Sequence, residues 1–313
     1  MGNYLGAMKQ HIEFQQGHEC FFFIANYHSL TTVQDAGLMR QLTLDVALDY
    51  LALGLDPAKA NLFRQSDIPE VTELAWILST VTGKGLLERA HSYKDKVDKG
   101  ITPSMGLFFY PILMAADILI YRSDLVPVGK DQVQHIEMTQ DMAGYFNNTF
   151  GREVFKRPEA KLNDAMIVPG VDGQKMSKSY GNAINLFDPP NATRKRIMSI
   201  KTDSTPVESP KNPETCNVFS LYKLLASPAE VAEMESNYRR GGYGYGEAKK
   251  ALGDVVERVL APSRERRERL ERNLDEVEEM LVAGARRARQ VAREVMEDVR
   301  DACGIVAAKS THC

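Results

Sequence analysis

The chain has 313 residues, a mass of 35.0 kDa and 43% apolar residues, enough for two domains with buried cores. Its formal net charge of -3 and isoelectric point near 6.1 exclude a uniformly basic surface, so any contact with nucleic acid has to use local basic patches. Four scattered cysteines, no apolar run long enough to span a bilayer and no secretory signal at the first residues predict a cytoplasmic protein with reduced thiols and no bound structural metal.

The first 170 residues are expected to alternate short apolar strands with amphipathic helices. Cys20 to Ala25 is a continuous apolar run of the kind that buried parallel strands show, followed by a loop with His28 and a helix from about Asp35 to Leu53. Asn61 to Arg64 and Leu125 to Val128 are further strand candidates, each ending in a polar loop. This alternation predicts an α/β fold with a Rossmann-like, doubly wound parallel sheet, in which ligands bind at the carboxyl ends of the strands.

A second feature is the apolar segment from Tyr110 to Leu119, predicted to be a helix with one carboxylate, Asp117. A buried carboxylate needs a donor, and the structural interpretation is an Asp satisfied by a backbone amide or by Arg122. The next segment, Val126 to Glu137, reads as a strand, a glycine turn and a helix. A glycine turn lets a ligand approach the backbone, and Asp131 in that turn can accept hydrogen bonds from paired hydroxyls. These features favour a ligand-binding role for Asp117 over a purely structural role in the core.

The most informative stretch is the pentapeptide K-M-S-K-S at residues 175–179, which follows G-V-D-G at residues 170–173. Two lysines three residues apart in a short loop can hold a triphosphate as pyrophosphate leaves, and serine hydroxyls and loop amides can add donors. A solvated surface loop is the alternative for an arbitrary K-x-x-K pattern. The full pentapeptide is rarer and favours nucleotide chemistry.

After Gly181 the pattern becomes helical. Helices are expected over Asn191–Ile200, Asn217–Ala226 and Pro228–Arg239, followed by a long Glu/Arg-rich pair from about Gly246 to Val299. The interspersed opposite charges are typical of a solvated helix face. We therefore predict two domains, a Rossmann-type catalytic domain at residues 1–180 that ends in the lysine loop, and a helical domain at residues 181–313.

The lysine pentapeptide resembles the signature of the class I aminoacyl-tRNA synthetases, and Met1-Gly2-Asn3 is similar to the end of the same class's H-x-G-N motif. The first His or Thr of that motif and the strand before it are absent, which makes the expected sheet N-terminally incomplete and implies a late start assignment or a truncation. The segments Y-P-x-L-M-A-A-D-I-L and G-x-D-Q-x-x-H-I-E resemble the tryptophanyl branch. The tyrosyl branch usually has Gln-Ala in place of Met114-Ala115.

The resemblance implies ATP-dependent ligation of L-tryptophan to tRNA(Trp) through a tryptophanyl-adenylate, with release of AMP and pyrophosphate. ATP is expected to enter with Mg²⁺, with no dedicated protein cage for the metal. The implied partners are tRNA(Trp) and a second copy of the chain in a homodimer, with no membrane and no DNA. The alternatives are a tyrosyl-tRNA synthetase, a nucleotidyltransferase of the same fold, and a truncated synthetase-like protein that binds nucleotide or RNA without catalysis.

The resemblance also assigns residues to ATP. The groups implied to act on the leaving phosphates are Lys175, Lys178, Ser177 and Lys96. For Lys96 an exposed K-D-K in a charged helix is an equally open interpretation. The residues implied to contact the rest of the nucleotide are Gly2, Asn3, Gly129, Asp131, Ile167, Val168, Met176 and Ser179. Among them, Gly2 and Asn3 would face phosphates at a helix N-terminus, Asp131 would bind the ribose, and Ile167 and Val168 would offer backbone bonds to adenine.

A second set is implied to bind L-tryptophan. Its members are Asp117, which would accept the indole N–H, the ring-pocket residues Met114, Val126 and Val128, the ammonium ligands Tyr110 and Gln132, and His28. For His28 a satisfied loop histidine is as open as a pocket wall. An apolar slot with one buried acceptor prefers a ring that carries a donor, because phenylalanine would leave the carboxylate unpaired. Tyrosine also carries a donor, so its exclusion depends on pocket size, which the sequence does not show.

The helical half would read the anticodon. Arg194-Lys195-Arg196 and Arg286-Arg287 are candidates for phosphate contacts, with a solvated helix face as the alternative.

Overall fold

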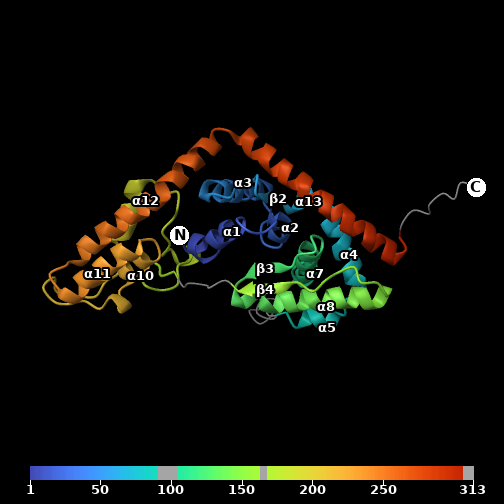
Figure 1. The fold of residues 1–313 in the computed structure, drawn as a ribbon, viewed down its shortest axis with the longest axis horizontal. Coiled ribbons are helices and arrows are strands. Elements are labelled where there is room, and N and C mark those ends of the chain that lie inside the picture. The colour runs from blue at the N-terminus through green and yellow to red at the C-terminus, as the bar shows by residue number, and fades with distance from the viewer. Residues whose placement is uncertain (91–103, 163–167, 306–313) are drawn as a thin grey trace, which may run out of the picture. The chain divides into compact units, whose positions relative to one another are not determined.

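The computed structural model describes residues 1–90, 104–162 and 168–305 (Figure 1). The chain forms two compact units, each assembled from separate parts of the sequence. Unit 1 comprises Met1–Phe14, Tyr50–Gly54 and Asp164–Arg272, and unit 2 comprises Gln15–Asp49, Leu55–Asn163 and Asn273–Cys313. Within the described ranges, no helix combines the length and apolar character needed to cross a membrane.

Two parallel strand pairs form the sheets of unit 2. Strand β1 (Cys20–Ile24) pairs with β2 (Ala60–Arg64), and β3 (Leu125–Val128) pairs with β4 (Glu159–Leu162). The predicted strands at β1, β2 and β3 are confirmed within one residue. Strand β4 was not predicted, because its sequence E-A-K-L is largely exposed and lacks the apolar run used to find the others.

The helices of unit 2 are α3 (Ala36–Leu53), whose last residues belong to unit 1, and α4 (Glu70–Val81), α5 (Lys84–Glu88), α7 (Met105–Leu119), α8 (Val133–Phe150) and α13 (Leu274–Cys303). Helices α4, α5, α7, α8 and α13 pack around a core that includes residues of β1 and β2. Helix α7 is capped at its N-terminus by Ser104, whose side chain accepts a hydrogen bond of 3.2 Å from the amide of Leu107. This cap fixes the start of the helix that carries Asp117.

Helix α13 packs directly against β2 (Figure 1). A Cβ atom added to Gly284 would lie 2.9 Å from the carbonyl carbon of Leu62 and closer still to its oxygen, so the two backbones touch where glycine stands. Ion pairs secure the helix further along, where Arg289 and Arg293 reach Glu70 over 2.8 and 3.3 Å. In its packing α13 therefore belongs with the strands, and the predicted division of roles at residue 180 stays a prediction.

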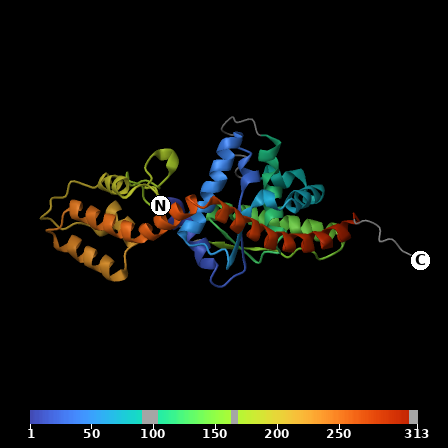
Figure 2. The same cartoon turned by 90° about the horizontal axis from the view of Figure 1, so that it is seen from above.

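Unit 1 holds the remaining helices, α1 (Lys9–Phe14), α9 (Pro190–Met198), α10 (Asn217–Lys223), α11 (Pro228–Arg240) and α12 (Tyr245–Glu271) (Figure 2). Helices α9 to α12, together with α13 of unit 2, confirm the helices predicted after Gly181, with ends that differ by a few residues. The π-helical turn η1 (Tyr4–Met8) precedes α1. The core of unit 1 is formed by buried residues that include Ile197, Leu221, Tyr238 and Leu252. The short elements of unit 2 are α2 (Asn26–Ser29), η2 (Gln65–Asp67) and η3 (Lys130–Gln132), and those of unit 1 include η4 (Lys178–Tyr180) and η5 (Pro213–Thr215).

Candidate active site

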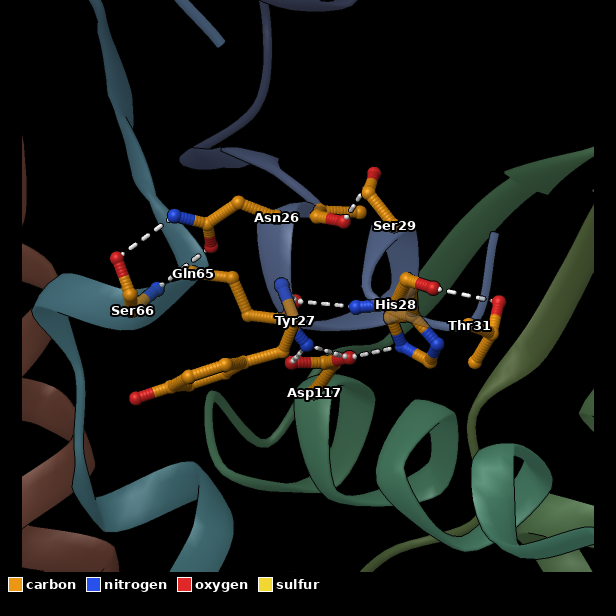
Figure 3. A network of polar contacts seen from close by, with 9 residues as sticks. Asn26, Tyr27, His28, Ser29, Thr31, Gln65, Ser66 and Asp117 are labelled. Atoms are coloured by element: carbon orange, nitrogen blue, oxygen red, sulfur yellow. Dashed lines mark hydrogen bonds and ion pairs between the residues drawn. The ribbon is translucent and has the colours of Figure 1, made fainter. Parts of the chain in front are cut away.

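Asp117 lies buried on α7, with 3% of its surface exposed. Its carboxylate accepts hydrogen bonds from Gln65 Nε2, at 2.9 Å to Oδ1 and 2.8 Å to Oδ2, and from His28 Nε2 at 2.9 Å to Oδ2 (Figure 3). Arg122, the donor considered in the structural interpretation, instead pairs with Asp298. The carboxylate is therefore held by side chains that follow β1 and β2.

Burial raises the pKa of Asp117 above its usual value, because an apolar surrounding disfavours the charged form. The hydrogen bonds from His28 and Gln65 act in the opposite direction and favour the carboxylate. These two side chains are thus the local groups that support an ionised acceptor at this buried position.

The carboxyl ends of β1 and β2 are locked together beside Asp117. Asn26 Nδ2 donates to Ser66 Oγ at 2.7 Å, and the amide of Ser66 donates back to Asn26 Oδ1 at 3.0 Å (Figure 3). This reciprocal pair joins α2, which follows β1, to η2, which follows β2. The site thus lies where a parallel sheet is expected to bind its ligand.

An apolar cluster lies along the same helix. Three residues predicted to line a ring pocket, Met114, Val126 and Val128, gather in one hydrophobic cluster with Ile118 and Ile136. They come from α7 and β3, with Ile136 contributed by α8. The structure therefore brings the three predicted residues together, and their role toward a ligand stays a prediction.

Two polar groups predicted to bind an ammonium lie on α7 and η3. Tyr110 Oη is 2.6 Å from His135 Nε2, and its ring stands edge-on to that of His28 with centroids 6.5 Å apart. Gln132 Nε2 donates to Asp131 Oδ2 at 2.9 Å. A Cβ atom at Gly129 would lie 2.7 Å from Asp131 Oδ1, so the absence of a side chain at Gly129 leaves room for that carboxylate.

The lysine loop, residues 168–182, is a narrow hairpin in unit 1. Pro169 and Lys175 form an antiparallel bridge, and the amide of Met176 donates to the carbonyl of Val168 at 2.8 Å. Gly173 takes a φ of +87° at the tip, a conformation that glycine adopts without strain. Beyond the bridge, Ser177 Oγ and Ser179 Oγ lie 2.7 Å apart.

Residues from the start of the chain lie against this hairpin. The amide of Gly2 contacts Met176 Sδ at 3.2 Å, and Asn3 directly precedes η1. The predicted nucleotide residues Gly2, Val168, Met176 and Ser177 are thus neighbours although they are far apart in the sequence. Of the other predicted residues, Lys96 and Ile167 and the side chain of Lys178 lie outside the described part of the structure.

Asn182 holds the hairpin from inside and was not predicted. It is 2% exposed, its Nδ2 donates to Asp172 Oδ1 at 2.8 Å and to the carbonyl of Lys175 at 3.1 Å, and its Oδ1 accepts from the amide of Ser177 at 2.8 Å. A Cβ atom at Gly170 would overlap its side chain. One weak sequence signal points to it, a polar residue just before the apolar Ala183-Ile184.

Residues 1–261 match the family described as tRNA synthetases class I (W and Y). The chain belongs to this family. The synthetase is 55% identical over 305 residues to a tryptophan–tRNA ligase of Rhodopirellula baltica, covering 97% of this chain and 95% of that protein. It is 50% identical over 307 residues to a tryptophan–tRNA ligase of Fusobacterium nucleatum, covering 98% of this chain and 94% of the relative. The tryptophanyl-tRNA synthetase of Campylobacter jejuni, solved with ADP and tryptophan, superposes with a TM-score of 0.91 at 46% identity, covering 97% of this chain and 95% of that one.

Several basic residues considered for tRNA contacts are engaged within the synthetase. Arg194 pairs with Asp254 at 2.9 Å, and Arg196 Nε donates to the carbonyl of Ala183 at 3.0 Å. Arg287 Nε donates to Asn61 Oδ1 at 2.6 Å. These contacts favour a structural role for the three arginines, whereas Lys195 is exposed on α9.

In this synthetase, Asn182→Ala is expected to lower the kcat of ATP–pyrophosphate exchange about tenfold, because the lysine loop, which is predicted to hold the leaving phosphates, would lose its alignment with them. The free energy of unfolding should fall by about 1–3 kcal/mol, since the half-buried amide of Ser177 loses its partner. Exchange kinetics and urea unfolding measure the two effects. Asn185→Ala, which removes an exposed bond to Asp188, is the control. An unchanged kcat in Asn182→Ala would show that the loop does not depend on this side chain.

Proposed function

We propose that the synthetase joins L-tryptophan to tRNA(Trp) in two steps. The tryptophan carboxylate attacks the α-phosphorus of ATP, which forms tryptophanyl-adenylate and releases pyrophosphate. The terminal ribose hydroxyl of the tRNA then takes the acyl group and AMP leaves. The observation that carries the tryptophan assignment is the buried Asp117 beside an apolar cluster, supported by the tryptophan–tRNA ligases that resemble this chain.

In the amino-acid site, Asp117 accepts the indole N–H. Met114, Val126 and Val128 supply the apolar surface for the ring, while Tyr110 and Gln132 hold the ammonium. The edge-on contact between Tyr110 and His28 supports a place for His28 in the pocket wall. Phenylalanine is disfavoured because it would leave the Asp117 carboxylate without the donor that the site is built to accept.

In the nucleotide site, the lysine loop stabilises the charge that develops on the leaving pyrophosphate. Lys175 and Lys178 supply the positive charge, Ser177 and Ser179 supply hydroxyl donors, and Lys96 is a further phosphate ligand. The remaining contacts of ATP are assigned to Gly2, Asn3, Met176, Val168, Ile167, Gly129 and Asp131. Mg²⁺ enters with ATP as part of the substrate. No protein nucleophile takes part, so the rate depends on alignment and charge stabilisation.

The part of the chain after residue 180 is proposed to bind the tRNA, with its helices reading the anticodon. The N-terminal part, residues 1–180, carries the catalytic residues. A cytoplasmic location stays a prediction from the sequence.

We further propose that the synthetase acts as a homodimer, with α3 in the interface. Leu38, Leu42 and Val46, four residues apart along one face of the helix, are 49%, 42% and 36% exposed. Sedimentation at micromolar concentration should give the mass of two chains, and Leu42→Glu should shift the population toward one chain. Arg40→Glu, a charge change at an exposed position of the same helix, is the comparison. A monomeric native chain would refute the dimer.

Amino-acid-dependent ATP–pyrophosphate exchange tests the central proposal, with all twenty amino acids offered separately and charging of tRNA(Trp) measured afterwards. Exchange with tryptophan alone is the expected result. Exchange with tyrosine instead would favour the tyrosyl alternative. A folded sample that is silent with every amino acid would overturn the proposal in favour of a binding protein without catalysis.

A further inference from the structure

Gln65 makes four hydrogen bonds through its single carboxamide, which lies against Asp117 in the proposed amino-acid site. It begins η2 directly after β2 and is 1% exposed. Its Nε2 donates to both oxygens of Asp117, and its Oε1 accepts from the amides of Tyr27 at 3.0 Å and His28 at 3.4 Å (Figure 3). The side chain therefore links α2, η2 and α7.

The partners of this carboxamide fix its orientation. The Tyr27 and His28 amides can only donate, and an ionised Asp117 can only accept. A flipped carboxamide would set its oxygen against the carboxylate and its NH₂ group against two N–H donors. A neutral amide that is locked in this way donates to Asp117 without adding a positive charge that would compete for the carboxylate as a salt-bridge partner.

The acceptor capacity of Asp117 is nearly used in this arrangement. An ionised carboxylate offers about four lone-pair positions, two on each oxygen. Among the described residues, Oδ2 accepts from Gln65 and His28, and Oδ1 accepts from Gln65. One position remains on Oδ1, enough for a single N–H donor.

We propose that Gln65 is a positioning residue for substrate specificity, which orients Asp117 so that one acceptor position is open to a ring that carries one N–H. This inference rests on the proposed function, because it assigns that open position to the indole nitrogen. Gln65 acts through Asp117 and has no direct role in adenylate chemistry. Its loss is therefore expected to affect the binding of tryptophan and to spare the binding of a ring without the N–H.

Two variants separate the halves of the carboxamide. Gln65→Glu keeps an oxygen for the Tyr27 and His28 amides but places a second carboxyl group against Asp117, which repels the carboxylate or shares a proton with it and so weakens it as an acceptor for the ligand. Gln65→Met removes both the donor and the acceptor at a similar length. Asp67→Asn is the matched control, because Asp67 lies on the same turn and its side chain accepts from Arg64 Nε at 2.9 Å rather than bonding to Asp117. Pyrophosphate exchange is measured with tryptophan and with β-(3-benzothienyl)alanine, in which sulfur replaces the indole N–H. Thermal melting confirms that each variant is folded.

Both Gln65 variants are expected to raise KM for tryptophan about 10- to 100-fold, the range for a lost hydrogen bond to a charged group, with kcat changed less than threefold. KM for the sulfur analogue should change less than threefold, so selectivity for tryptophan falls at least tenfold. Asp67→Asn should keep the native selectivity. Equal losses with both substrates would indicate general damage to the fold and overturn the proposal.

The wild-type chain supplies a test that does not depend on variant folding. If it uses tryptophan and the sulfur analogue with equal kcat/KM, no N–H is being selected and the inference on Gln65 is wrong, although the ligase proposal stands. If the wild-type chain shows no exchange with tryptophan, the proposed function itself fails.

Discussion

Asp117→Ala is expected to raise KM for tryptophan at least about 100-fold while kcat falls much less. The substitution removes the acceptor for the indole N–H and leaves the donor of the buried Gln65 and that of the half-buried His28 without their partner. Such losses correspond to about 3 kcal/mol when the bonds involve a charged group. Steady-state exchange kinetics over a wide range of tryptophan concentrations separate KM from kcat.

Asp117→Asn is the matched comparison for this variant. It keeps the size of the side chain and one acceptor oxygen but removes the charge, so its KM should lie between those of the native chain and Asp117→Ala. KM for ATP should be unchanged in both. Native tryptophan kinetics in Asp117→Ala would exclude this carboxylate from the amino-acid site.

Gly284→Ala is expected to lower the free energy of unfolding by at least about 2–3 kcal/mol. The new methyl group would be forced into the backbone of β2 at Leu62, so α13 would have to move away from the strand. Alanine favours a helix over glycine by about 1 kcal/mol, which is smaller than the cost of the overlap. Urea unfolding followed by circular dichroism measures the change.

Gly144→Ala, in the same unit, is expected to change the free energy of unfolding in the opposite direction. Gly144 lies within α8, and a Cβ atom there would meet nothing within 4 Å. The helix propensity of alanine should then act alone and stabilise the protein by up to about 1 kcal/mol. Equal stability of the two variants would show that the contact between α13 and β2 does not limit the fold.

The sequence predicted the elements that follow a simple apolar pattern. The run Cys20 to Ala25, the helix around Asp117 and the glycine turn at Gly129 all lie where the pattern placed them. Strand β4 was not predicted, because it is short and mostly exposed and its sequence has no periodic apolar pattern. The sequence also did not predict that α13 belongs to the same unit as the strands. The charged faces of this helix resemble those of α12, and it is placed against the strands by contacts such as those of Gly284 with Leu62 and Arg287 with Asn61.

The residues that position the site were harder to predict than those assigned to the ligand. Asp117 drew attention as the one charge in an apolar segment, whereas Gln65 and Asn182 are uncharged residues in ordinary loops. Each acts through a carboxamide that bonds residues from other parts of the fold or loop. A hydrogen bond between Gln65 and Asp117, 52 positions apart, leaves no periodic trace in a single sequence.

The interleaved make-up of the two units sets the order in which the chain can fold during its synthesis. Strand β2 is made early, but its partner α13 is among the last helices to be translated. At roughly 5–20 residues per second, the ribosome needs on the order of ten to forty seconds to add the residues between Leu62 and Gly284. The first fourteen residues likewise wait for residues 164–272 before unit 1 can close. The nascent chain therefore carries the apolar strand β2 through most of translation before α13 can cover it, and exposed apolar surface of this kind favours aggregation of incomplete chains.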